Sequence, residues 1–159
     1  MIHRRRLDPR IALAAVVVLT IAACGGAAQA SPSSAPSTST PTGVMQVMAK
    51  GQLHDVDGTA SGLAELVALP DGAYEVILDS FSIDAIAHTN VVLVANADVT
   101  KTGDVDKSKL LDLGPVKGTS GMQTYAIPAD MAVVVMDGYH SVVIWDTEMA
   151  HAIAAAPLK

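Results

Sequence analysis

The sequence of residues 44–159 predicts an all-β fold, an antiparallel β-sandwich with Greek-key or jelly-roll-like connections. Val, Ile and Thr cluster in short runs, and turn residues separate them at Pro70-Asp71-Gly72, Gly114-Pro115 and Asp137-Gly138. Short segments with frequent turns are typical of sandwiches. A domain of about 116 residues can bury ~65% of its unfolded surface without staples. We expect strands at 44–48, 59–69, 73–79, 91–95, 123–127, 132–136 and 141–145.

The triplet Pro70-Asp71-Gly72 predicts a β-hairpin between the second and third of these runs. Pro presets φ for the turn, and Gly accepts a positive φ. On both sides of the triplet, one set of residues alternates with its neighbours, as strands require. They are Ala64, Leu66 and Ala68 before it, and Tyr74, Val76 and Leu78 after it.

One run is compatible with a helix. Residues 147–156 read Thr-Glu-Met-Ala-His-Ala-Ile-Ala-Ala-Ala, and Ala has the highest helix propensity. Pro157 follows at once, and ten residues make only a marginal helix.

Residues 1–23 are predicted to be a signal peptide. Residues 1–10 are basic, and residues 11–23 are apolar without a charge, which are the n-region and h-region of a secretory signal. Thirteen helical residues reach about 20 Å, short of the ~30 Å hydrocarbon core of a bilayer. We therefore expect an export signal and no membrane span.

The sequence Ile21-Ala22-Ala23-Cys24-Gly25 resembles the bacterial lipobox, which implies that Cys24 becomes the lipidated first residue of the mature chain. The alternative is an ordinary secretory signal with an incidental cysteine. Stable anchoring needs two or more acyl chains, and a lipobox implies at least two. The expected location is the outer face of the cell membrane, with the membrane as a partner through Cys24.

Residues 24–43 are predicted to be a linker. Residues 31–42 are all Ser, Thr, Pro or Ala, a composition that stays extended and solvated because it has nothing to bury. The linker could carry O-linked sugars or be bare, and the sequence leaves both open.

Charge and cysteine content exclude several function classes. All four Arg lie in the first ten residues, and from residue 24 onward six Lys face fifteen Asp and Glu. An acidic body without Arg lacks the basic footprint of a nucleic-acid-binding protein. The single cysteine excludes an internal disulfide framework and a structural zinc site of several cysteines.

Catalytic and calcium motifs fail on inspection, so we expect no enzyme and no cofactor. Gly118-Thr119-Ser120-Gly121 lacks one residue of a nucleophile elbow. The acidic segments that begin at Asp55 and Asp104 lack the Glu that a calcium loop needs at position twelve. Both segments are predicted to be polar turns.

The remaining candidate ligands are few. Asp146, Glu148 and His151 are close enough in sequence to share a metal, although a solvated polar edge is the simpler interpretation. The scattered methionines could suggest a soft-metal site, but most of them are predicted to fill a core that has only one Phe. They are Met45, Met48, Met122, Met131, Met136 and Met149.

Two strings near the C-terminus carry a family resemblance. Residues 113–128 read Leu-Gly-Pro-Val-Lys-Gly-Thr-Ser-Gly-Met-Gln-Thr-Tyr-Ala-Ile-Pro, and residues 139–145 read Tyr-His-Ser-Val-Val-Ile-Trp. Both resemble segments of the DM-thirteen domain family, and Ala156-Pro157-Leu158 matches its terminal Ala-Pro-Leu. The resemblance covers roughly residues 47–158. It implies a secreted all-β domain with a proposed role in electron transfer.

The proposed electron-transfer role of that family depends on a Cys directly after the Ile-Trp pair, and this chain has Asp146 there. A carboxylate cannot cycle between thiol and disulfide. We therefore predict a membrane-anchored, non-enzymatic binding module that recognises an unknown envelope protein or ligand. The alternative is a redox or metal-linked accessory protein in which Asp146 serves as a ligand, helped by Glu148 and His151.

Overall fold

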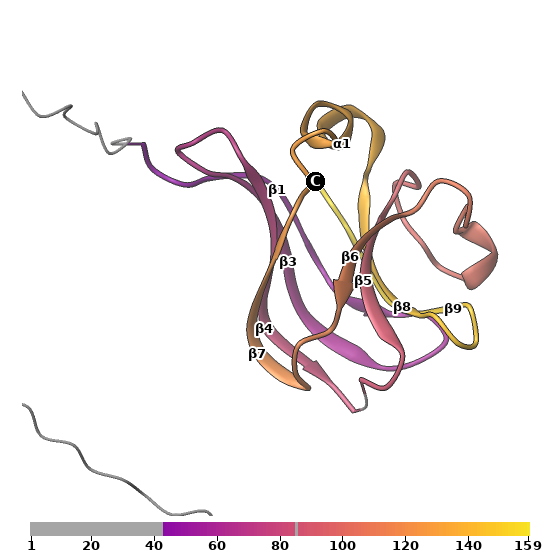
Figure 1. Ribbon diagram of the computed structural model, residues 1–159. Coiled ribbons are helices and arrows are strands. Elements are labelled where there is room, and N and C mark those ends of the chain that lie inside the picture. The colour runs from indigo at the N-terminus through magenta and orange to yellow at the C-terminus, as the bar shows by residue number, and fades with distance from the viewer. Residues whose placement is uncertain (1–42, 85) are drawn as a thin grey trace, which may run out of the picture. The chain divides into compact units, whose positions relative to one another are not determined.

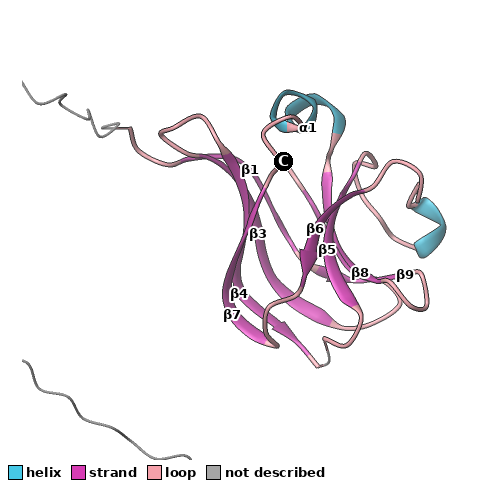
Figure 2. Ribbon diagram, in the orientation of Figure 1, coloured by secondary structure: helices cyan, strands magenta, loops and turns pink. Residues whose placement is uncertain are grey.

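The computed structural model describes residues 43–84 and 86–159, which form two antiparallel sheets packed face to face (Figures 1 and 2). The first sheet has the strand order β1 (Gln46–Gln52), β3 (Ala60–Ala68), β4 (Tyr74–Ile83) and β7 (Ser120–Ala126). The second has the order β2 (His54–Asp55), β9 (His151–Pro157), β8 (Ser141–Asp146), β5 (Thr89–Val94) and β6 (Leu111–Pro115). The predicted all-β sandwich is confirmed.

The main core lies between the two sheets. Alternate residues of each strand point into this core, and most of the side chains that fill it are aliphatic. The first sheet contributes Leu66, Val76, Leu78 and Phe81, and the second contributes Val91, Leu93, Val142 and Ile144.

A smaller second core covers the outer face of the five-stranded sheet. Residues 95–110 form a long loop beside β5 and β8 (Figure 1). Val99 and Val105 from this loop pack on Val143 and Trp145. The loop contains a short 3₁₀ turn, η1 (Thr102–Asp104), and the Lys107 ammonium lies 5.5 Å from the centre of the Trp145 ring. Both faces of β8 are therefore buried.

The predicted hairpin is confirmed. Strands β3 and β4 pair in one register from Ala68↔Tyr74 to Leu63↔Asp79, and Gly72 at the turn has φ of 86°. The Gly72 N–H donates to the Leu69 carbonyl at 3.0 Å. The alternation also holds, because Leu66 and Val76 lie in the core.

The predicted strand at 132–136 is wrong, because these residues form helix α1 (Ala132–Gly138). Backbone hydrogen bonds from Met131 to Pro128 and from Ala132 to Ala129 already close a turn before the helix begins. The helix continues that turn even though β-branched Val disfavours it. Its one buried residue is Val135.

The run 147–156 is not helical. Residues 147–150 form a turn, and β9 begins at His151 and pairs with β8 and β2. The alanines are needed for close packing, since Ala154 and Ala156 lie in the main core and Ala152 and Ala155 lie in the second.

Strand β6 was not predicted from the sequence. Gly114-Pro115 is typical of a break between strands, although both residues belong to β6.

The prediction that the methionines fill the core is wrong for four of them. Met131 and Met136 do pack against the main core. The exposed ones are Met45, Met48, Met122 and Met149.

In the described part of the chain, no helix is long and apolar enough to cross a membrane. The predicted signal peptide, Cys24 and residues 24–42 of the predicted linker lie outside the described residues.

Candidate functional site

Asp146 is the last residue of β8, at one end of the five-stranded sheet. Its register partners are Thr89 in β5 and His151 in β9. The chain then turns through residues 147–150 and returns as β9. The position that carries Cys in the resembled family is thus the start of a tight turn.

The Asp146 carboxylate caps this turn. The backbone N–H groups of Met149 and Glu148 both donate to Oδ1, at 2.7 and 2.9 Å. The hydrogen bond from Met149 is the largest influence on the carboxyl group, and with the bond from Glu148 and the nearby His151 and His88 it lowers the pKa of Asp146. The carboxylate therefore has a structural role in the ionised form.

A second strand end is attached to the same turn. The backbone N–H and the hydroxyl of Thr147 donate to the His88 carbonyl at 2.8 and 2.9 Å. The His88 imidazole in turn lies 3.3 Å from a Glu148 carboxylate oxygen. We call the five residues His88, Asp146, Glu148, Met149 and His151 the Asp146 corner.

The Asp146 corner presents varied chemistry to solvent. The His88 and Glu148 side chains are about two-thirds exposed, and Met149 is 74% exposed. An open hollow of about 240 Å³ begins at His151 and is also lined by Gly58, Thr59, Ile83, Asp84 and Ile153. The carboxylate of Glu148 and the thioether of Met149 thus stand on the turn, the imidazole of His88 lies beside it, and a concave surface adjoins them at His151.

The candidate metal ligands do not gather as a metal site requires. Glu148 contacts His88, and Asp146 uses Oδ1 for the two backbone N–H groups. Across residues 43–84 and 86–159, no three His, Cys, Asp or Glu side chains lie together in a way that could hold a metal ion. Sequence reasoning missed His88, because only the register of β5 with β8 brings it to this turn.

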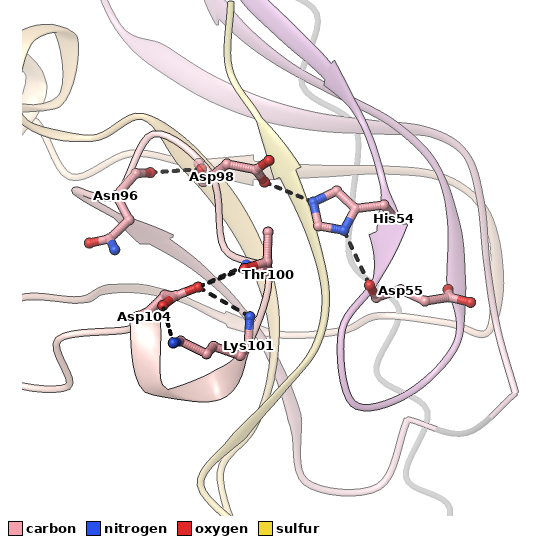
Figure 3. A network of polar contacts seen from close by, with 8 residues as sticks. His54, Asp55, Asn96, Asp98, Thr100, Lys101 and Asp104 are labelled. Atoms are coloured by element: carbon pink, nitrogen blue, oxygen red, sulfur yellow. Dashed lines mark hydrogen bonds and ion pairs between the residues drawn. The ribbon is translucent and has the colours of Figure 1, made fainter.

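The acidic segment that begins at Asp104 behaves as a polar turn, as predicted (Figure 3). In the segment that begins at Asp55, Asp55 ends strand β2 and a bend follows at residues 56–58. Asp104 Oδ2 accepts hydrogen bonds from the Thr100 and Lys101 N–H groups at 3.0 and 3.2 Å. Asp106 accepts from the Ser108 N–H and hydroxyl. These bonds lower the pKa of both carboxyl groups. The backbone bond from Thr100 contributes most at Asp104, and the Ser108 hydroxyl contributes most at Asp106.

A histidine bridges β2 and the 95–110 loop (Figure 3). His54 Nε2 lies 2.8 Å from Asp98 Oδ1, and Nδ1 lies 3.2 Å from the Asp55 carbonyl. Partial burial lowers the pKa of His54, but the hydrogen bonds to Asp98 and Asp55 outweigh that effect and the net pKa is raised. The charged imidazolium can donate to both oxygens at once.

The string at 113–128 folds into a self-supporting network. Buried Gln123 accepts the Lys117 N–H at 2.9 Å, accepts the Tyr125 hydroxyl at 2.7 Å, and donates to the Gly118 carbonyl at 2.7 Å. The Lys117 ammonium lies over the Tyr125 ring, 4.6 Å from its centre, and donates to the Thr124 carbonyl. The most recognisable residues of the string therefore hold the loop before β7 onto the core.

The model of the family described as electron transfer DM13 matches residues 50–158, which is more than half of the chain. The chain belongs to that family. The match covers nearly the whole sandwich and includes both strings and Asp146. Neither a curated protein nor a solved structure matches the chain.

In this electron transfer DM13 domain, the residue after the Ile144-Trp145 pair is the carboxylic acid Asp146. A thiol at the Asp146 position could exchange electrons, whereas the carboxylate found there is held as a turn cap. The family assignment thus agrees with the fold, and the Asp146 corner differs in its chemistry.

Proposed function

We propose that the protein is a membrane-anchored extracytoplasmic lipoprotein whose β-domain is a non-enzymatic binding module in the cell envelope. The observation that carries the proposal is the state of Asp146. Its Oδ1 is committed to the N–H groups of Glu148 and Met149, so the position associated with electron transfer here stabilises a turn. A stable turn is a suitable platform for recognition, because binding residues work best on a rigid scaffold.

The binding surface in this proposal is the Asp146 corner with its adjoining hollow. Glu148 stands exposed on the turn and His88 stands exposed beside it, and Met149 adds apolar area next to them. The thioether adapts its shape to a partner surface, and the imidazole and carboxylate supply directional hydrogen bonds. An envelope protein or a polar ligand of the envelope fits this mixture.

The lipobox at Ile21–Gly25 supports the anchor part of the proposal. The test is a Cys24→Ala variant of the full chain, followed by cell fractionation and mass spectrometry of the wild-type N-terminus. We expect a diacylglyceryl-modified Cys24 in the membrane fraction, and loss of the variant from that fraction. An unmodified N-terminus in a soluble wild-type protein contradicts the anchor.

The binding part is tested with the full chain in its own envelope. Chemical crosslinking followed by mass spectrometry is applied to the wild type, to the double variant His88→Ala/Glu148→Ala, and to Met122→Ala. Met122 is the control, since its side chain is about as exposed as those of His88 and Glu148 but lies on β7, outside the Asp146 corner. We expect a crosslinked partner or ligand that the double variant loses and the control keeps. The same products from all three proteins, or none from the wild type, contradict a binding role for the corner.

A further inference from the structure

Residues 44–48 lead into strand β1 and form its first three residues, and their apolar side chains are exposed. Val44, Met45, Val47 and Met48 are 88%, 54%, 48% and 38% exposed. Strand β1 is the edge of the four-stranded sheet and pairs on one side with β3. Apolar residues at an exposed edge strand are unusual, because such an edge can pair with another chain.

The other side of β1 is only half covered. Lys50 exchanges backbone hydrogen bonds with Lys159 at 3.0 and 3.1 Å, so the C-terminal residues lie along β1 at that point. Between residues 44 and 49, the described part of the chain supplies no backbone partner on this side. A row of N–H and C=O groups is thus open to a further strand.

The other edges of the two sheets are protected, and β1 is not. Strand β2 has two residues and ends in Asp55, and β6 contains Asp112 and Pro115. On β7 the Lys117 ammonium reaches the Thr124 carbonyl. Short strands, charges and Pro are the usual protection of a sheet edge. Residues 44–49 contain no charge and no Pro, and a bulge after Val47 is the only such feature of this segment.

The outer face of the sheet shows what kind of strand fits. Val47 lies opposite Val67, which is fully buried there. The two valines form an apolar cross-strand row that ends at Val47, whose free side faces solvent. A cross-strand apolar pair stabilises a sheet, so an added strand with a Val or Met at this position would extend the row.

We propose that residues 44–49 pair with the same segment of a second copy of this chain, antiparallel about a two-fold axis. Such pairing places the segment against itself, so a charge at the centre of the segment would face the same charge of the second copy. The segment has none, and the register centred on Val47 sets this valine opposite the same valine of the second copy, which extends the apolar row of Val67 and Val47. The two four-stranded sheets then become one continuous sheet of the dimer. This contact lies on β1 and does not depend on the binding role of the Asp146 corner.

The test is thiol crosslinking of the full chain in its membrane. Variants Met45→Cys, Gln46→Cys and Val47→Cys are each treated with a short thiol-to-thiol crosslinker, and Met122→Cys is the matched control on the opposite edge strand β7. Antiparallel pairing brings Cα atoms at the centre of the contact to about 5 Å, so we expect homodimers from the β1 variants at least about tenfold above the control. Equal yields, or a crosslink to a different protein, overturn the proposal.

A second measurement distinguishes loss of the dimer from poor folding of a variant. Residues 43–159 contain both cores, so this fragment is suited to sedimentation equilibrium. We expect a dimer for the wild type and for Met122→Lys, and a dimerisation constant weakened about tenfold or more for Val47→Lys, because two ammonium groups then face each other. A monomeric wild type at high concentration, or an unchanged dimer for a folded Val47→Lys, overturns it.

Discussion

The Asp146 carboxylate accepts a hydrogen bond of 2.7 Å from the backbone N–H of Met149, three residues along the chain. This bond, with the one from Glu148, closes the turn that returns β8 into β9. The same sequence position is the one at which the resembled family has Cys. The carboxylate therefore stabilises the turn at the position where the proposed electron-transfer role of the family expects a thiol.

Replacing Asp146 tests the capping role. Asp146→Ala removes the acceptor and lowers the melting temperature, whereas Asp146→Asn keeps an Oδ1 acceptor and lowers it less. The folded pKa of Asp146 is lowered, so its contribution is present above the ordinary value of 3.8 and is lost as the pH falls through the folded pKa. The difference in melting temperature between wild type and Asp146→Ala should thus shrink in acid. A difference that is the same at all pH values contradicts the account.

The Gln123 side chain makes hydrogen bonds to three neighbours, and its removal should lower the free energy of unfolding. Gln123→Ala leaves the Lys117 N–H, the Gly118 carbonyl and the Tyr125 hydroxyl without this partner. We expect a loss of roughly 2–4 kcal/mol in the free energy of unfolding, measured by chemical denaturation. Tyr125→Phe removes one hydroxyl and should cost about 1 kcal/mol. A smaller effect for Gln123→Ala than for Tyr125→Phe would show that the network is not centred on Gln123.

Two valines in the same helix give a matched pair. Val135 is fully buried, and Val133 is 82% exposed. Val135→Ala should lower the free energy of unfolding by about 2 kcal/mol, because two buried methyl groups are lost. Val133→Ala should change it by less than about 0.5 kcal/mol or raise it, since Ala favours helix. Equal losses in denaturant unfolding would mean that α1 packs differently.

The ion pair of His54 and Asp98 makes stability depend on pH near neutrality. The folded pKa of His54 is raised above its ordinary value of 6.5, so the stabilisation is fully present below 6.5 and is lost as the pH rises through the folded pKa. Asp98→Asn should lower the pKa of His54, measured by NMR titration of the imidazole. The stability gap between wild type and variant should close with rising pH. An unchanged His54 titration in the variant contradicts the pairing.

The sequence was informative wherever one short-range feature decides the structure. Pro70, Asp71 and Gly72 fix a turn by their own backbone preferences, so the hairpin could be predicted. Val133 and Val134 favour a strand locally, yet turns before them start a helix that Val135 anchors by tertiary packing. The alanines of β9 favour a helix by their local propensity. The sequence does not show that this strand packs against a core on each face, which leaves room only for small side chains.

The site was predictable only in part. Asp146, Glu148 and His151 are near in sequence, and the register places Asp146 opposite His151. Glu148 instead contacts His88, which is far away in sequence and reaches the turn through the pairing of β5 with β8. The exposure of Met45 and Met48 could not be foreseen either, since apolar composition does not distinguish an edge strand from a buried one.

The most direct test of the account is to measure redox activity and metal content of the full chain purified from its own membrane. Native mass spectrometry and elemental analysis give the bound groups, and protein-film voltammetry gives any electron exchange. We predict no stoichiometric metal or cofactor and no reversible voltammetric wave, for the wild type and for Asp146→Asn alike. A reversible wave with a stoichiometric bound group in the wild type, lost in Asp146→Ala, would contradict the account and make the Asp146 corner an electron-transfer site.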